Sequence, residues 1–458
     1  MAGNSSLKTP ASPSSAYSWY VVFVLTLLYI VSFLDRTVIS LVIDPLKADL
    51  GVTDTQVSLL SGLAFALFYS VIGIPVGRLA DRRSRRWIIG IGATFWGVMA
   101  SLCGIAQTYA QLFFARVGLG IGEATLMPSA YSMISDYFPR KKLPRAYAVM
   151  MLGAPIGSGL AFVVGGMIMS YAENVGVVEF PVLGEIRSWQ LVFLITGLPG
   201  IALALWALLT VREPLRTGLM QTSREAKQLS LRAVLEFARG RWTTYGTLLS
   251  GMSLSAMFTL GYFGWIAPFF VRTHGLDESE VGSLFGPVAI IGGVAGVLAG
   301  SFWCTWLAKR GRIDAPLRTA VHSLWIAIPC GIAAPLAGDV DLSLALIAVL
   351  VFFLTFPQGT NVAAFQLITP NEMRAQVSAV FLLITNVFGL GLGATTVALL
   401  TDYVFGAPER INDSLALMTA LVAIPSLCLL TLGLKPYRAS IEEAENWLGR
   451  GPAGADSV

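Results

Sequence analysis

The chain alternates long apolar runs with short polar segments. Six apolar runs fall near residues 18–43, 56–77, 87–107, 110–135, 146–171 and 189–210, and six more fall near 246–271, 281–306, 319–337, 343–368, 376–402 and 414–434. A helix that crosses a membrane needs about 20 apolar residues, so each run is long enough for one crossing. The pattern therefore predicts an all-α membrane protein with twelve transmembrane helices in two groups of six.

The composition excludes an ordinary soluble domain. Hydrophobic residues make up 55% of the 458 residues, charged residues make up 13%, and the mean hydropathy is +0.70. Soluble domains carry about 25% charged residues. The four cysteines and two histidines have neither disulfide nor metal-ligand spacing, so we expect no metal site and no cofactor.

The polar segments divide the chain. We expect a flexible cytoplasmic tail at 1–17, a six-helix bundle at 18–211, a cytoplasmic linker at 212–241, a second bundle at 242–435 and a cytoplasmic tail at 436–458. The first tail has no basic stretch leading into a short apolar core, so no secretory signal is predicted. In the linker, apolar residues recur at helical spacing beside arginines, which predicts an amphipathic surface helix: Leu231, Val234, Leu235 and Ala238.

The distribution of Lys and Arg predicts the orientation. If the N-terminus is cytoplasmic, 25 of the 31 Lys and Arg residues lie on the cytoplasmic side and four on the outside, namely Lys47, Arg187, Arg272 and Arg410. Positive residues concentrate on the cytoplasmic side of membrane proteins. Both termini are therefore predicted to be cytoplasmic. The net charge of +4 reflects this topology, and no nucleic-acid partner is expected.

The two halves resemble each other in sequence. YFPRKKLPRAYAVMMLGAPIGSGL follows the fourth apolar run, and ITPNEMRAQVSAVFLLITNVFGLGLG follows the tenth. Both have a proline near the turn, an Arg-Ala pair that opens the next helix and a glycine-rich stretch inside it. Duplicated halves of this kind predict two pseudo-symmetric six-helix bundles.

The loop between the second and third runs, Gly77 to Arg86, reads GRLADRRSRR. It resembles the signature loop of the major facilitator superfamily. Gly77 would permit close packing, and Asp81 would cap a helix or pair with arginines when the inner gate is closed. A loop that only follows the distribution of positive charge is the alternative. The predicted gating residues are Gly77, Asp81, Arg82, Arg85, Arg86 and, in the next cytoplasmic loop, Arg145.

Four ionisable residues lie inside predicted spans: Asp35, Arg36, Arg116 and Glu123. At 1.5 Å per residue, Asp35 lies about 12 Å and Arg116 about 9 Å from the outer ends of their helices. We hypothesise that this column binds substrate and couples transport to protons: the arginines would bind an anionic group, and Asp35 or Glu123 would take up a proton. A static network of two ion pairs holding spans one and four together is the alternative.

The second half carries aromatic and amide side chains in place of buried charge. We expect a pocket for an apolar tail formed by Tyr262, Phe263, Trp265, Phe269, Phe356, Gln358, Asn361 and Asn386. Each of these aromatic residues, taken alone, fits ordinary packing as well. A charged half facing an apolar half suits an amphiphile with an anionic head.

Several fragments resemble the spinster family of lysolipid transporters within that superfamily: FLDRTVIS, ARVGLGIGEA (115–124) and PIGSGLAFVVGG (155–166). The resemblance implies Asp35, Arg36, Arg116 and Glu123 as working residues and a lysolipid or sphingosine-phosphate-like cargo. The short tails and loops suggest a bacterial member in the inner membrane.

The sequence thus predicts a proton-linked transporter of an anionic amphiphile that works by alternating access as a monomer among membrane lipids. The runner-up is a transporter of a small organic anion, such as a sugar acid or an aromatic carboxylate. A membrane-embedded enzyme would need a Ser-His, His-Asp or metal-type constellation at one membrane face, and neither His274 nor His322 has an evident partner. A receptor or a channel is disfavoured by the duplicated halves and the loop motif.

Overall fold

The structure, a computed structural model, consists almost entirely of helices. It describes residues 15–139, 142–175, 178–180, 184–214, 231–370 and 373–448. The first half contains α1 (Ser15–Thr37), α2 (Ile43–Leu50), α3 (Asp54–Ser58), α4 (Ala64–Arg82), α5 (Arg85–Cys103), α6 (Tyr109–Glu123), α7 (Leu126–Tyr137), α8 (Leu143–Met151), α9 (Gly153–Val175), the strands β1 (Val178–Phe180) and β2 (Gly184–Ile186), and α10 (Ser188–Thr210). The strands form one antiparallel hairpin.

The second half begins with α11 (Leu231–Gly240), which lies in the region predicted as the linker. It continues with α12 (Trp242–His274), α13 (Glu278–Lys309), α14 (Ala315–Leu336), α15 (Val340–Thr355), α16 (Gln358–Leu367), α17 (Arg374–Asn386), α18 (Gly393–Leu399), α19 (Ile411–Met418) and α20 (Ile424–Leu448). Short 3₁₀ or π-helical segments join several of these helices end to end: Val38–Leu41, Leu59–Leu63, Val387–Leu392, Leu400–Phe405 and Thr419–Ala423.

Eleven continuous helical segments in the described residues are long and apolar enough to cross a membrane. The twelfth crossing, predicted near 110–135, is made of α6 and α7, which are broken at Ala124 and Thr125. Pro128 in the first turn of α7 has no N–H, so it cannot donate to the carbonyl of Ala124. The predicted twelve-helix membrane fold is thus confirmed, with one crossing divided directly after Glu123.

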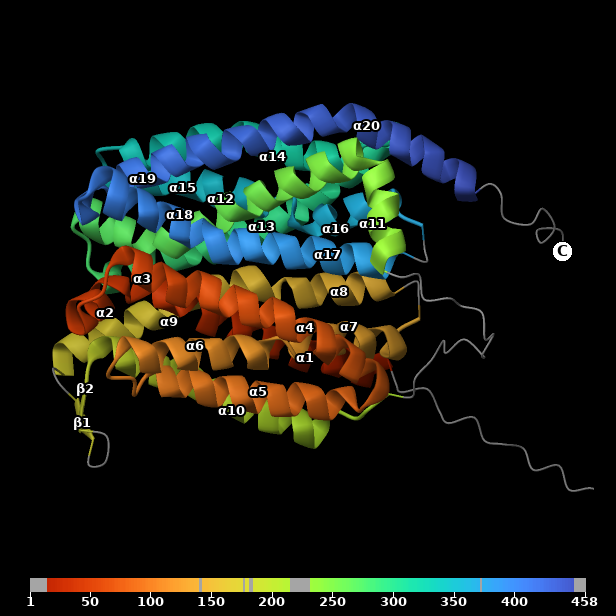
Figure 1. The fold of residues 1–458 in the computed structure, drawn as a ribbon. Helices are drawn as coiled ribbons and strands as arrows, with labels where there is room; N and C mark the ends of the chain where they lie inside the picture. The colour runs from red at the N-terminus through yellow and green to blue at the C-terminus, as the bar shows by residue number, and fades with distance from the viewer. Residues whose placement is uncertain are drawn as a thin grey trace, which may run out of the picture.

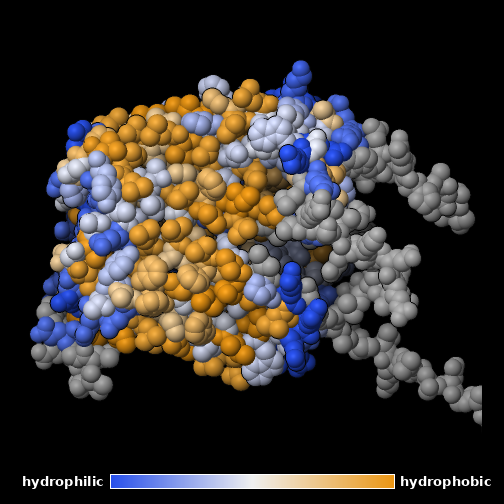
Figure 2. Space-filling view, in the orientation of Figure 1, coloured by the Kyte–Doolittle hydropathy of each residue, from blue (hydrophilic) through white to orange (hydrophobic). Residues whose placement is uncertain are grey.

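The helices form two adjacent bundles, with α1 to α10 in one and α12 to α20 in the other (Figure 1). A broad apolar band covers the middle of the molecule, and hydrophilic residues gather at its two ends (Figure 2). We call the end where α1 begins and α20 ends the terminal end, and the opposite end, which carries α2, α3 and the hairpin, the distal end. The band is the surface expected to face lipid hydrocarbon.

The two bundles touch closely where α9 runs beside α13. A Cβ atom added to Gly286 would lie 2.4 Å from Val163 and 3.1 Å from the carbonyl oxygen of Gly159. Only small residues allow two transmembrane backbones to approach so closely. The glycine-rich stretch of the fifth span therefore packs against the other bundle.

Helix α20 extends to Leu448, beyond the expected bundle end at residue 435. The hydroxyl of the buried Tyr437 donates to the carbonyl of Ala364 at 2.9 Å, and Thr244 and Ser440 share a hydrogen bond of 2.9 Å. These contacts tie the last turns of α20 to the second bundle.

Candidate functional site

Two of the four predicted ionisable residues, Arg36 and Glu123, form an ion pair close to the break in the first span. Arg36, at the end of α1, donates from Nη2 to Oε2 of Glu123 at 2.5 Å, and the Ser32 hydroxyl donates to the same oxygen at 2.6 Å. The Glu123 side chain is fully buried and that of Arg36 is 12% exposed. Charge-assisted hydrogen bonds in such a dry place are strong, so Arg36 and Glu123 hold α1 to α6.

Arg116 binds backbone carbonyls in the first bundle. Its guanidinium donates to the carbonyl oxygens of Asp35 at 3.0 Å, Arg36 at 3.3 Å and Leu60 at 3.5 Å. These carbonyls are available because α1 gives way to a 3₁₀ turn after Thr37, and because Leu60 lies in a π-helical segment. Arg116 thus donates hydrogen bonds to backbone carbonyls at two places where a helix is irregular.

Asp35 is buried, at 1% exposure, and neither carboxylate oxygen has a hydrogen-bond partner among the described residues. The alternative interpretation of this cluster was a static network of two ion pairs. In the described residues the cluster contains one ion pair, Arg36–Glu123. A buried ionised carboxylate without a partner is costly in free energy.

Aromatic rings surround the Arg36 guanidinium, which the sequence analysis did not anticipate. Its central carbon lies 4.4 Å from the centroid of the Phe65 ring, 4.8 Å from that of Phe33 and 5.2 Å from that of Tyr69. Cation–π attraction favours this arrangement. A ligand that reached Arg36 would therefore meet one carboxylate and three ring faces.

Arg116→Leu should lower the free energy of unfolding by about 3 kcal/mol, because buried polar groups left without partners cost about 1–3 kcal/mol each. Denaturant unfolding in detergent micelles measures the change. The control is Arg187→Leu, since Arg187 is largely exposed and pairs with Asp49 at the distal end. An unchanged unfolding midpoint for Arg116→Leu would contradict the carbonyl-binding role.

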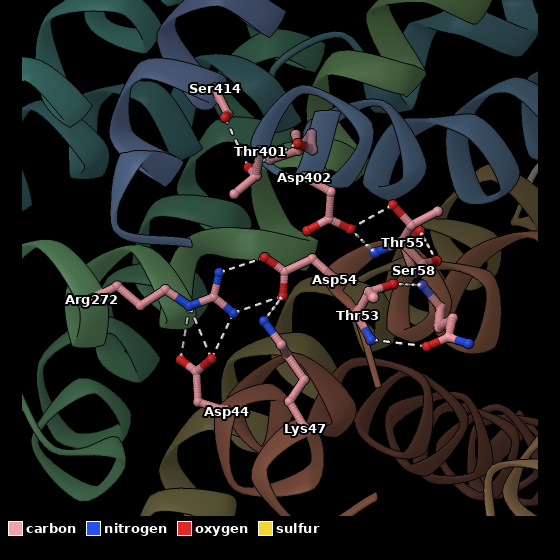
Figure 3. A network of polar contacts seen from close by, with 12 residues as sticks. Asp44, Lys47, Thr53, Asp54, Thr55, Ser58, Arg272, Thr401, Asp402 and Ser414 are labelled. Atoms are coloured by element: carbon pink, nitrogen blue, oxygen red, sulfur yellow. Dashed lines mark hydrogen bonds and ion pairs between the residues drawn. The ribbon is translucent and has the colours of Figure 1, made fainter. Parts of the chain in front are cut away.

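The bundles are joined at the distal end by a charged cluster (Figure 3). Arg272, at the end of α12, donates to both carboxylate oxygens of Asp44 at 2.6 to 3.2 Å and to those of Asp54 at 2.7 and 2.9 Å. Lys47 pairs with Asp54 at 2.5 Å. We call Asp44, Lys47, Asp54 and Arg272 the distal cluster. Arg272 alone belongs to the second bundle, so its fork crosses the interface.

A second distal contact pairs an acidic side chain with a helix start. Asp402 of the second bundle accepts hydrogen bonds from the backbone N–H of Thr55 at 2.8 Å and from its hydroxyl at 2.6 Å. A carboxylate is favoured near the N-terminus of a helix, here α3. Deeper in, a Cβ atom on Gly62 would lie 2.4 Å from the carbonyl oxygen of Leu390. The distal halves of spans two and eleven are therefore in close contact.

At the terminal end, Arg85 is the centre of a buried network within the first bundle. It pairs with Asp136 at 2.5 Å and with Glu213 at 2.8 Å, and it donates to the Ser132 hydroxyl at 2.9 Å. The backbone N–H of Arg86 donates to Glu213 at 2.9 Å. The third span is thereby joined to the ends of the fourth and sixth spans.

The other predicted gating residues do not share this network. A Cβ atom on Gly77 would meet nothing within 4 Å in this structure, so the packing role of Gly77 stays a prediction. Arg82 and Arg145 are exposed. The side chain of Asp81 lies outside the described residues.

The second bundle also has a buried ionic network at the terminal end, but its central residue is acidic. Asp314, buried at the start of α14, pairs with Arg438 at 2.5 Å and with Arg318 at 2.8 Å. Here a buried carboxylate joins spans nine and twelve, whereas a buried arginine joins spans three and six in the first bundle. The sequence analysis missed Asp314 because it compared only the loop motif.

Comparisons with known proteins agree with this architecture. The sequence pattern of the Major Facilitator Superfamily matches residues 25–394. The chain belongs to this superfamily. It is therefore an integral membrane protein and a secondary transporter.

Individual relatives are more distant. The transporter is 28% identical over 441 residues to an MFS-type efflux pump of Mycolicibacterium smegmatis, covering 93% of this chain and 95% of that protein. It is 28% identical over 305 residues to a probable L-galactonate transporter of Escherichia coli, covering 63% and 62%. A crystal structure of a bacterial homologue of the human lysosomal transporter Spinster, inward-facing and unoccupied, matches with a TM-score of 0.77 and 26% identity over 96% of this chain and 100% of that one. The predicted resemblance to spinster transporters is thus confirmed.

Three of the residues predicted for a tail pocket are core residues of the transporter. The Tyr262 hydroxyl donates to the carbonyl of Gly331 at 2.6 Å, the Trp265 indole N–H donates to the carbonyl of Ala394 at 2.7 Å, and Phe269 is fully buried. Satisfied polar ends and full burial are typical of packing.

The remaining pocket residues are more open, apart from Phe356. Phe263 and Asn386 are half-buried and Gln358 is exposed, whereas Phe356 is buried against Phe352. The Asn361 side chain is half-buried, but its carbonyl oxygen is buried and has no hydrogen-bond partner in the described part of the chain.

No group of three or more metal-binding side chains occurs in the described residues.

The acidic residues at the distal end were not predicted as site residues, although the sequence carried a signal for them. Asp44, Asp54 and Asp402 stand at span ends next to the few cations predicted to lie outside. Opposite charges at one end of several spans predict ion pairs there.

Proposed function

We propose that this transporter moves an anionic amphiphile, such as a lysolipid phosphate, in exchange with or together with protons. The observation that carries the proposal is the buried Arg36–Glu123 pair enclosed by Phe33, Phe65 and Tyr69. A charged head would bind at Arg36, and the apolar part would lie against the rings and against the open residues of the second bundle. Buried ionisable residues in membrane helices mark transport pathways.

The proposed cycle exchanges partners at Arg36. In the structure the guanidinium is occupied by Glu123. An incoming phosphate or carboxylate, which matches the guanidinium fork, replaces Glu123 there. Glu123 then lies buried without a cation and takes up a proton, or Asp35 does so in its place. Proton uptake and anion binding are thereby linked through one arginine.

We infer that the structure has the inward-facing conformation. The polar contacts that join the two bundles among the described residues lie at the distal end, at Arg272, Thr55 and Ser58. The matching Spinster homologue is also inward-facing. With both termini in the cytoplasm, the distal end is the outer one, and the distal cluster acts as the outer gate.

The wider arrangement is part of the same proposal. Bundles at 18–211 and 242–435 rock about the site, the 212–241 linker and both tails are cytoplasmic, and the protein acts as a monomer in a bacterial plasma membrane. Arg85 and Asp314 anchor the inner ends of the two bundles. Each bundle can then move as a unit.

A small organic anion, such as a sugar acid, is the second candidate cargo. It is favoured by the similarity to a probable L-galactonate transporter. Such an anion would use Arg36 in the same way but would have no apolar part for the aromatic rings.

Uptake of a labelled lysolipid phosphate into proteoliposomes with an imposed pH gradient tests the proposal. We expect gradient-dependent uptake that other lysolipids inhibit and that sugar acids leave unchanged. Inhibition by sugar acids, together with direct uptake of a labelled sugar acid, would support the second candidate. If proteoliposomes that contain the transporter in both orientations take up no lysolipid phosphate, the first candidate cargo is contradicted.

A further inference from the structure

A groove of about 510 Å³ lies between α12 and α20 on the outside of the second bundle. Its walls are formed mainly by Trp242, Thr243, Thr247, Leu432, Lys435 and Pro436. Because α12 begins at Trp242, the groove lies near the terminal end of the molecule. It is separate from the Arg36 cluster, which belongs to the first bundle.

The walls of the groove are apolar and face outward. The side chains of Trp242 and Leu432 are each 70% exposed. The Thr247 hydroxyl donates to the carbonyl of Thr243 at 2.6 Å, within its own helix, so it is not a free polar group in the wall. A tryptophan at the end of a transmembrane helix is typical of the membrane interface. The shape and surface suit a hydrocarbon chain.

Lys435 supplies positive charge at the rim. It is exposed, and no carboxylate among the described residues pairs with it. The neighbouring arginines are engaged in ion pairs, because Arg241 pairs with Glu443 at 2.5 Å and Arg438 shares the Asp314 carboxylate with Arg318. Among the residues that line the groove, Lys435 is the one that carries a positive charge.

We propose that this groove binds an anionic phospholipid, with an acyl chain along Trp242, Leu432 and Pro436 and the phosphate at Lys435. Charge complementarity and the membrane-interface position support a lipid. A second copy of the chain fits less well, because a two-fold interface here would bring the two Lys435 side chains together. The bound lipid would bridge the start of α12, directly after α11, and the last span.

Native mass spectrometry tests this with the full chain released from vesicles of equal phosphatidylglycerol and phosphatidylcholine content. The wild type should retain phosphatidylglycerol in preference to phosphatidylcholine. Lys435→Gln should lower phosphatidylglycerol retention about fivefold, the loss expected for one lysine near an anionic lipid, and should leave phosphatidylcholine unchanged. Lys435→Arg should keep the preference.

Two further variants make the result specific. Lys142→Gln removes an exposed lysine at the terminal end of the first bundle and should keep the preference. Leu432→Trp fills the groove and should lower retention of both lipids although Lys435 is present. Equal retention in wild type and Lys435→Gln, or equal loss in Lys142→Gln, would overturn the proposal. A dimer that Leu432→Trp dissociates would also overturn it and assign the groove to a second copy.

Discussion

Arg36→Ala is expected to reduce the catalytic efficiency of transport, kcat/KM, about 100-fold. Hydrogen bonds to charged groups contribute about 1.5–3 kcal/mol, and each 1.4 kcal/mol corresponds to a factor of ten. The variant loses the group that is proposed to bind the anion. Among the described residues, it leaves the Ser32 hydroxyl as the one hydrogen-bond partner of the buried Glu123. Initial uptake rates in proteoliposomes measure the effect.

Companion variants separate binding from folding. Arg36→Lys keeps the charge but lacks the planar fork, so it should retain part of the activity. Arg187→Ala removes one positive charge from a largely exposed side chain at the distal end and should transport like the wild type. Normal transport by a folded Arg36→Ala variant would show that the Arg36–Glu123 pair is static and only holds α1 to α6.

Arg272→Gln is expected to shift the conformational equilibrium at least about tenfold toward a state open at the distal end. The substitution removes the fork that joins Asp44 and Asp54 of the first bundle to α12 of the second (Figure 3). It also leaves two carboxylates close together with Lys47 as their neighbouring cation. Contacts of this strength, about 1.5–3 kcal/mol, set population ratios of ten or more.

Distances between spin labels at Gln107 and Glu409 report on this opening, because both residues are exposed at the distal end in different bundles. Cys304, Cys330 and Cys428 would be replaced by serine, and the buried Cys103 would be retained. The longer-distance population should rise in Arg272→Gln. It should stay at the wild-type level in Arg187→Gln, whose ion pair with Asp49 lies within the first bundle. Identical distance distributions in all three proteins would contradict the gating role.

The position of the charged cluster was accessible from the sequence because helix rise converts residue number into depth. A rise of 1.5 Å per residue predicts similar depths for Asp35 and Arg116, at about 12 Å and about 9 Å from the outer ends of their helices. Which groups pair was not accessible. Arg116 binds carbonyls of Asp35 and Leu60, since the helices are irregular there, and hydropathy does not report such irregularities.

The pairings in the distal cluster could not be predicted from the sequence either, because they join residues that are far apart in the chain. Asp54 and Arg272 are more than 200 residues apart, and their contact depends on how the two bundles are rotated against each other.

Local hydropathy and the regular geometry of a helix were enough to predict the membrane fold and the number of crossings from the sequence. The tertiary structure alone decided that Arg36 holds Glu123, that Asp35 has no partner among the described residues and that Arg272 joins the bundles. These pairings depend on helix rotation and on breaks in the helices. Both arise from packing among segments that are distant in the chain.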